Sequence, residues 1–152
     1  MEYNGRIMGQ ARTGTRYSTT EVAHAGGWPR VSTYRGALGA RGEDIASAFL
    51  RAHGYTIQGR NYRCRYGEID LVCGHGTVLV FCEVKLRRSD TYGTPEEAIT
   101  PRKLARLALA AQSYLAEHGL EEADWRIDVV ALELDRRGAI MRMALYQAVG
   151  SE

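Results

Sequence analysis

The sequence predicts an α/β domain in which a mixed β-sheet is flanked by helices. Two segments carry apolar residues at helical spacing, and five others are rich in β-branched and aromatic residues. These segments follow one another in the order α-β-β-β-α-β-β, and such interleaving is typical of α/β proteins. The chain has 152 residues, of which 45% are hydrophobic and 25% charged, so it can bury the core of one domain.

Residues 1–35 are predicted to form a flexible basic arm, and residues 36–150 the folded domain. The arm is rich in Gly, Thr, Ser and Arg and has no helix or strand periodicity. The net charge of the whole chain is only +2, so a nucleic-acid site would have to be local rather than a property of the bulk charge. The segment GALGARG (36–42) has no strand before it and no Lys-Ser/Thr after it, unlike a phosphate loop, so we expect a flexible lead-in.

The first helix is predicted from Gly42 to His53, and Gly54 would end it. Its apolar positions recur at helical spacing: Ile45, Ala46, Phe49 and Leu50. A strand follows from Tyr55 to Arg63. The next two strands, Ile69–Cys73 and Val78–Val84, are joined by a Gly-His-Gly turn and are predicted to pair as a hairpin.

The segment Leu86–Gly93 is predicted to be a loop. Two Thr-Pro pairs follow it, Thr94-Pro95 and Thr100-Pro101. Each has the form of a helix N-cap followed by proline at the first helical position, where a missing N–H costs nothing. We therefore expect one helical turn and then a longer helix.

The longer helix is predicted from Pro101 to Glu117, with Gly119 ending it. Its apolar stripe consists of Leu104, Leu107, Ala108, Ala111 and Leu115. The segments Arg126–Leu134 and Met141–Val149 are predicted to be the last two strands.

The predicted hairpin brings charged residues together. Side chains alternate along a strand, so pairing the apolar row of one strand with that of the other fixes which residues share a face. The two apolar rows are Ile69, Leu71, Cys73 and Val78, Val80, Cys82, Val84. The same register places Asp70, Glu83 and Lys85 on the opposite face, near the end away from the turn.

Two carboxylates and an ammonium on one face allow two interpretations. Neighbouring carboxylates repel unless a cation lies between them, and oxygen ligands suit a hard ion such as Mg²⁺. A metal beside a lysine fits phosphodiester hydrolysis, in which the ammonium orients water or stabilises developing charge. The alternative is a cross-strand ion pair between Lys85 and an acid, which would contribute little.

Several blocks of the sequence carry a family likeness. The run GEIDLV, followed by EVK with twelve residues between Asp70 and Glu83, resembles the PD-(D/E)xK motif of restriction-endonuclease-like nucleases. The chain also resembles the YraN family of uncharacterised bacterial proteins, which is related to archaeal Holliday-junction resolvases. This likeness spans about Gly36 to Leu134 and includes the following blocks: GARGEDIASAFLRAHGY, GRNYRCRYGEIDLV, LVFCEVKLRR, YGTPEEAITPRK and WRIDVVAL.

The resemblance implies a restriction-endonuclease-like fold and a nuclease site. It implies that Asp70 and Glu83 bind a metal, Mg²⁺ or Mn²⁺, and that Lys85 is the catalytic lysine. Glu43 would be a further metal ligand or would position water. One departure is Ile69, which stands where many of these nucleases have proline. A fold does not by itself establish an activity, because function resides in the site.

Two functions follow as hypotheses. The first is a metal-dependent endonuclease acting on DNA, on branched or repair-intermediate structures, with RNA as an alternative substrate. The second is a non-catalytic nucleic-acid-binding accessory protein with a vestigial nuclease site. Resolvase-like cutting would favour a homodimer, because paired cuts need two symmetric sites.

Basic and aromatic residues are interleaved near the predicted site, as in surfaces that bind phosphates and stack on bases. The candidates for nucleic-acid contact are Arg63, Arg65, Arg87, Arg88, Tyr92 and Lys103. A solvated strand edge and loop is the alternative interpretation. Lys103 and Lys85 are also the only lysines beside eighteen arginines, which suggests positions that need a compact ammonium.

The remaining titratable residues are given mainly structural roles. Glu68 either neutralises Lys85 or Arg65 or is a further functional acid, and Asp128 is expected to pair with Arg126. The three cysteines lack metal-ligand spacing and are expected to be buried thiols of a cytoplasmic protein. No run approaches the roughly 18 apolar residues of a membrane span, so no membrane partner is expected.

Overall fold

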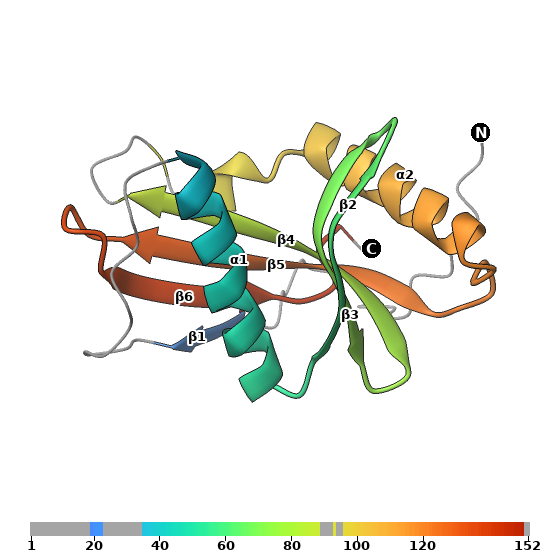
Figure 1. Cartoon of the computed structure of the whole chain (residues 1–152), viewed down its shortest axis with the longest axis horizontal. Coiled ribbons are helices and arrows are strands. Elements are labelled where there is room, and N and C mark those ends of the chain that lie inside the picture. The colour runs from blue at the N-terminus through green and yellow to red at the C-terminus, as the bar shows by residue number, and fades with distance from the viewer. Residues whose placement is uncertain (1–18, 23–34, 89–92, 94–95, 151–152) are drawn as a thin grey trace.

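The helices and strands follow the predicted order, with one short strand added before them (Figure 1). The computed structural model describes residues 19–22, 35–88, 93 and 96–150. The elements are β1 (Thr19–Val22), α1 (Arg35–Ala52), β2 (Thr56–Cys64), β3 (Gly67–His75), β4 (Val78–Arg88), the 3-10 turn η1 (Glu96–Ala98), α2 (Pro101–Glu117), β5 (Trp125–Leu134) and β6 (Ile140–Tyr146). The fold is α/β, as the sequence predicts.

All six strands belong to one mixed sheet in the order β1-β6-β5-β4-β3-β2. The β4–β5 pair is parallel and the other pairs are antiparallel. The parallel pair requires a crossover, which η1 and α2 supply. The predicted β3–β4 hairpin is confirmed, although its turn lies at Gly76 and Thr77, beyond the last pair His75↔Val78.

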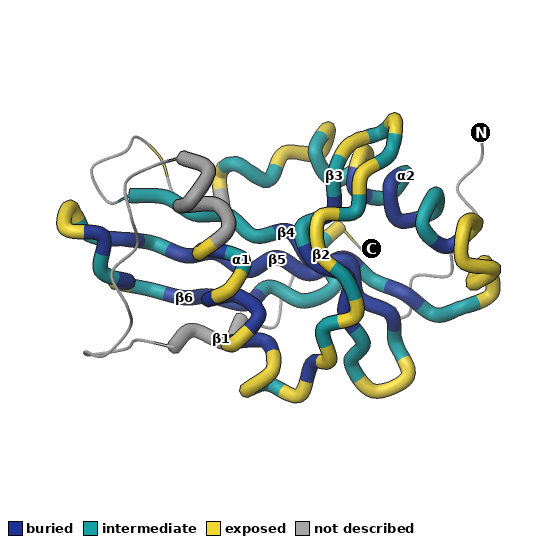
Figure 2. Tube along the Cα trace, in the orientation of Figure 1, coloured by how far each residue is buried: buried dark blue, intermediate teal, exposed yellow. Residues whose placement is uncertain are grey.

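The two long helices cover opposite faces of the sheet (Figure 1). Alternate residues of β4 separate the two cores, because Val80 and Cys82 pack on the α1 side while Leu79 and Phe81 pack on the α2 side. The central strands β4, β5 and β6 are buried along much of their length, whereas β2 is largely exposed (Figure 2). Every residue of the predicted α2 stripe is buried or packed against the core.

The ends of α2 also agree with the prediction. The Thr100 hydroxyl accepts a hydrogen bond from the Lys103 N–H at 3.2 Å, and proline occupies the first helical position. Gly119 follows the helix with φ 64°, a conformation that favours glycine. The first Thr-Pro pair, 94–95, lies outside the described residues, and η1 begins directly after it.

Three segments differ from the prediction. The segment 36–42, predicted as a flexible lead-in, forms the first turns of α1; its three glycines lower helix propensity, but extending an existing helix costs little. Strand β4 continues through Leu86–Arg88, which the sequence assigned to a loop, because these residues pair with β5. Strand β1 lies within the predicted arm and is too short to produce a periodic signal; the rest of the arm, 1–18 and 23–34, lies outside the described residues.

The alternation of side chains breaks in β3. Ile69 was predicted to share a face with Leu71 and Cys73, but it packs in the opposite core, on the α2 side. The cause is local: β3 ceases to pair with β4 beyond Leu71↔Cys82, and Asn61 of β2, opposite Asp70 in the register, has φ 53°. Among the described residues, no helix has the length and apolar character needed to cross a membrane.

Candidate metal centre

The site lies where β3 and β4 separate. The β3–β4 ladder ends at Leu71↔Cys82, and beyond it an Asp70 carboxylate oxygen, Oδ2, accepts a hydrogen bond from the Val84 N–H at 2.8 Å. The side chain of Asp70 thus accepts from β4 in the place of a backbone carbonyl. This hydrogen bond fixes the carboxylate between the two strands.

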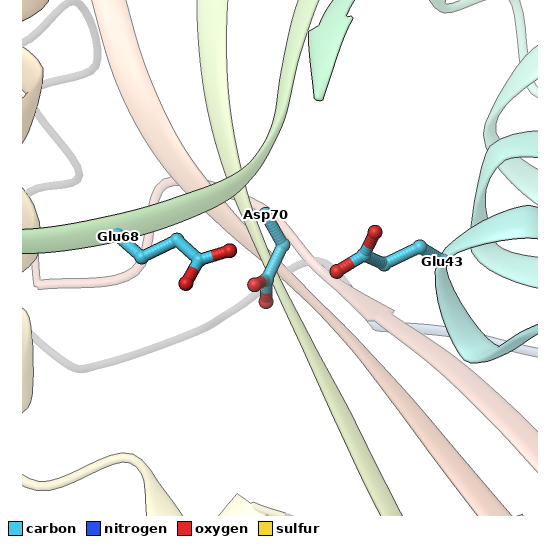
Figure 3. Close-up of side chains that lie close together, drawn as sticks. All are labelled: Glu43, Glu68 and Asp70. Carbon is cyan, nitrogen blue, oxygen red and sulfur yellow. The ribbon is translucent and has the colours of Figure 1, made fainter. Parts of the chain in front are cut away.

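Three carboxylates meet at this point (Figure 3). Glu43 comes from α1, and Glu68 and Asp70 come from β3, where residues two apart share a face. Each offers one oxygen, and these oxygens all lie within 4.8 Å of one another. The side chain of Asn61, whose backbone is left-handed, lies near Glu43 and opposes the rise in the pKa of that carboxyl.

Glu83 adds a fourth, more deeply buried carboxylate. Its side chain is 4% exposed, and it interacts directly with the carboxyl of Asp70. Its Oε1 lies 3.1 Å from the Lys85 ammonium and 3.4 Å from that of Lys103. Its Oε2 is buried and has no hydrogen-bond partner among the described residues, which is uncommon for a buried carboxylate oxygen.

Burial, together with neighbouring acids, raises the pKa of two of these carboxyls, Asp70 and Glu43. Burial, and then repulsion from Glu83 and Glu43, raise the pKa of Asp70 to about 7, against the lowering effect of the Val84 N–H. Burial also raises the pKa of Glu43, opposed by the hydrogen bond from Asn61. The folded protein therefore holds these carboxylates in a place that disfavours their charge.

The clustered oxygens of Glu43, Glu68 and Asp70 form a donor set for one hard divalent ion, and Glu83 lies beside Asp70. Four carboxylates and two ammoniums leave two negative charges, apart from the exposed Arg63, which lies 3.4 Å from Glu68. All donors are oxygens, as Mg²⁺ and Mn²⁺ prefer. The unpartnered Oε2 of Glu83 supplies a lone pair that no group of the described chain uses.

The structure brings together the four residues predicted to be catalytic, namely Asp70, Glu83, Lys85 and Glu43. For Glu68 the sequence left open a functional role or the neutralisation of a cation; it belongs to the acidic cluster, and its cation is Arg63 rather than Lys85 or Arg65. Its spacing of two from Asp70 was the available signal. Asn61 carried no signal in the sequence, because its role depends on a strand irregularity.

The predicted nucleic-acid contacts lie in several places. Arg65 donates to the Tyr66 hydroxyl at 2.8 Å, Arg88 donates to the Arg136 carbonyl at 3.0 Å, and Arg87 is half-buried at the end of β4. Tyr92 lies outside the described residues. A cavity of about 80 Å³ adjoins the acids and is lined by Tyr66, Gly67, Glu68, Lys103, Arg106 and Leu107. The role of these groups in binding nucleic acid stays a prediction.

The mixed sheet and its cluster of acids and lysines define an α/β protein with a candidate metal centre. Residues 42–132 match the model of the uncharacterised protein family UPF0102, and the chain belongs to this family. This result confirms the resemblance to uncharacterised bacterial proteins that the sequence indicated.

Three relatives in this family illustrate the match. The protein of Pelotomaculum thermopropionicum is 43% identical over 113 residues, which cover 74% of this chain and 94% of the relative. That of Beutenbergia cavernae is 50% identical over 103 residues, 68% of this chain and 87% of the relative. That of Symbiobacterium thermophilum is 53% identical over 96 residues, 63% of this chain and 81% of the relative.

Proposed function

We propose that this protein is a metal-dependent nuclease that hydrolyses DNA phosphodiester bonds. The observation that carries the proposal is Glu83. Its carboxylate is 4% exposed, one oxygen is held by two lysines, and the other has no hydrogen-bond donor among the described residues. It lies beside Asp70, which itself clusters with Glu43 and Glu68. Buried carboxylates that lie close together repel one another, and a divalent ion would reduce this repulsion.

Asp70 and Glu83 would hold the ion, Mg²⁺ or Mn²⁺, together with Glu43. Glu68, whose oxygen lies within the same 4.8 Å group, is a further donor. When bound, such an ion polarises a phosphate oxygen and acidifies a coordinated water. The chain's contribution is to fix the donors, through the Val84 N–H on Asp70 and the Asn61 amide on Glu43.

Lys85 would contribute a positive charge next to the reacting phosphate. Its ammonium is fixed on Glu83 at 3.1 Å, and its side chain is still 26% exposed, so it can reach a substrate phosphate or water. An ammonium in this position orients the attacking water and stabilises the charge that develops on the phosphate. Arg106, in the adjoining cavity, adds a cation for a neighbouring phosphate.

The substrate we propose is DNA, in branched or repair-intermediate form, cut by a protein that acts as a homodimer. This choice is supported by the resemblance to junction resolvases. RNA of the same structure provides the comparison that tests it.

The decisive experiment measures cleavage of duplex, single-stranded, flapped and four-way DNA in Mg²⁺ and in Mn²⁺. Asp70→Asn and Glu83→Gln preserve shape and remove charge, and each should lower cleavage by at least about 100-fold. Asp44→Asn is the matched control, because Asp44 neighbours Glu43 on α1 but points to an exposed ion pair with Arg60.

The result that would reject the proposal is equally direct. If the Asp70→Asn/Glu83→Gln double variant nicks DNA as fast as the wild type, the activity resides elsewhere. If the wild type binds DNA in EDTA and cleaves nothing in either metal, the non-catalytic binding protein is the correct function. Salt-sensitive binding would then be its measurable property.

A further inference from the structure

Both lysines of this chain reach the same atom. The protein has eighteen arginines and two lysines, and the ammoniums of Lys85 and Lys103 lie 3.1 and 3.4 Å from Oε1 of Glu83. They come from different elements, Lys85 from β4 and Lys103 from α2. A chain that uses arginine almost everywhere thus places its two compact ammoniums on a single buried oxygen, where two planar guanidinium groups would compete for space.

The position of Lys103 is fixed by α2. Its backbone N–H is the donor to the capping Thr100 hydroxyl at 3.2 Å, so it lies in the first, capped turn of the helix. Leu104 and Leu107, which follow Lys103 and share one face of the helix, pack into the core between α2 and the sheet. The ammonium is therefore carried to Glu83 by a packed helix rather than by a loop.

Two cations on Oε1 have a directional consequence for Glu83. Rotating the carboxylate away from its present plane would break both ion pairs at once. The arrangement therefore keeps Oε2, which has no partner in the described part of the chain, in one orientation beside the carboxyl of Asp70. Ligands held in advance bind a metal more tightly, because less side-chain freedom is lost on binding.

We infer that Lys103 is a positioning residue of the metal centre, which together with Lys85 orients Glu83 toward the ion. This inference rests on the proposed metal-dependent function and deepens it. Lys103 was a candidate for nucleic-acid contact on sequence grounds, and the geometry assigns its ammonium to the protein's own carboxylate instead.

The sign of the effect separates this role from two others. If Lys103 were only a neighbouring charge, removing it would remove repulsion and tighten metal binding. If it were a DNA contact, removing it would weaken DNA binding and leave metal affinity unchanged. If it positions Glu83, removing it weakens metal binding and lowers kcat, while DNA binding without metal stays the same.

The test uses the whole chain and the variants Lys103→Met and Lys103→Gln. The matched control is Arg106→Met, because Arg106 lies three residues along the same helix, lines the same cavity and is exposed, with no ion pair among the described residues. Mn²⁺ affinity is measured by calorimetry at pH 8.5, DNA affinity by fluorescence anisotropy in EDTA, and kcat on the best substrate found for the wild type.

We expect both Lys103 variants to bind Mn²⁺ about tenfold more weakly and to lose about tenfold in kcat, with DNA affinity in EDTA within about twofold of wild type. Arg106→Met should bind Mn²⁺ as wild type does and should bind DNA in EDTA more weakly, because Arg106 lines the cavity but forms no ion pair with the acids among the described residues. Unchanged or tighter Mn²⁺ binding in the Lys103 variants, in a wild type that binds Mn²⁺ and cleaves, overturns the positioning role alone. A wild type that binds no Mn²⁺ overturns both this inference and the proposed function.

Discussion

Two buried carboxylates on neighbouring strands differ in whether both of their oxygens have hydrogen-bond partners. Asp128 of β5 pairs in register with Cys82, the residue before Glu83 on β4. Asp128 is fully buried, and both of its oxygens are satisfied: Oδ1 accepts from the Arg126 guanidinium and the Ala148 N–H at 2.9 Å, and Oδ2 accepts from the Tyr55 hydroxyl at 2.7 Å. Glu83 is almost as buried, but its Oε2 has no partner among the described residues.

The two carboxylates differ in the hydrogen-bond partners of their oxygens rather than in burial. The contacts of Asp128 connect the start of β2, the end of β6 and, through Arg126, the β3–β4 turn, where Arg126 and the Nδ1 atom of His75 are 2.9 Å apart. Such a network is complete and holds the fold together. Glu83 instead lies beside Asp70, whose pKa is raised by burial and by repulsion from Glu83 and Glu43. A buried acid with every lone pair used indicates structure, and one left incomplete indicates a place for a ligand.

The largest predicted effect is on the stability of a protein that lacks the Asp128 carboxylate. Asp128→Ala leaves the half-buried Arg126 without its carboxylate and removes the acceptor of the Tyr55 hydroxyl, so it should lower the free energy of unfolding by about 3 kcal/mol, measured by urea denaturation. Glu133→Ala, on the same strand, removes only a partly exposed carboxylate 3.9 Å from Arg142 and should cost less than about 1 kcal/mol. An Asp128→Ala protein as stable as wild type would show that the network does not hold the fold.

The second prediction concerns Asp70, the neighbour of Glu83, and has the opposite sign. The pKa of Asp70 rises from 3.8 to about 7 on folding, so the folded state binds the proton more tightly than the unfolded state. Wild-type stability therefore falls as pH rises from about 4 to 7. Asp70→Asn, which can still accept from the Val84 N–H, should be more stable than wild type by roughly 2 kcal/mol at pH 8 in EDTA and equal to it near pH 4.

Mg²⁺ provides the control for the Asp70 prediction. The ion should raise the melting temperature of the wild type at pH 8 and leave that of Asp70→Asn unchanged, because binding requires the carboxylate. Below pH 7 the stabilisation of the wild type should fade, since protons and metal compete for Asp70. If Asp70→Asn is less stable than wild type at pH 8, the charge of Asp70 does not destabilise the folded protein. The acids around Glu83 would then stabilise the fold, as the Asp128 network does.

The fold was predictable because its signals are local. Helical spacing gave α2 within its observed bounds, and the Thr100-Pro101 pair gave its start. Alternation gave the β3–β4 pairing and therefore the meeting of Asp70, Glu83 and Lys85. The start of α1 was missed because glycines weaken its pattern, and β1 because four residues show no period.

The rest of the site depends on tertiary contacts that no spacing encodes. Ile69 changes face because β3 leaves β4 at Asp70, and the same break directs Glu68 and Asp70 toward Glu43 of α1. The approach of Lys103 to Glu83 depends on how α2 packs on the sheet. The structural role of Asp128 could be predicted from its i, i+2 spacing to Arg126, a contact between neighbours in sequence, and the hydrogen bonds between them confirm it.

The smallest predicted effect concerns the helix cap beside Lys103, which contacts Glu83. Thr100→Ala removes the hydroxyl that accepts from the Lys103 N–H and should cost about 1 kcal/mol of stability, measured by urea denaturation. Because the ammonium of Lys103 remains but its helical turn frays, Mn²⁺ affinity should fall less than in Lys103→Met. Thr77→Ala, in the exposed β3–β4 turn beside the Asp128 network, should change neither quantity. If Thr100→Ala weakened Mn²⁺ binding as much as Lys103→Met, the cap itself, and not the ammonium on Glu83, would be what holds the metal centre in place.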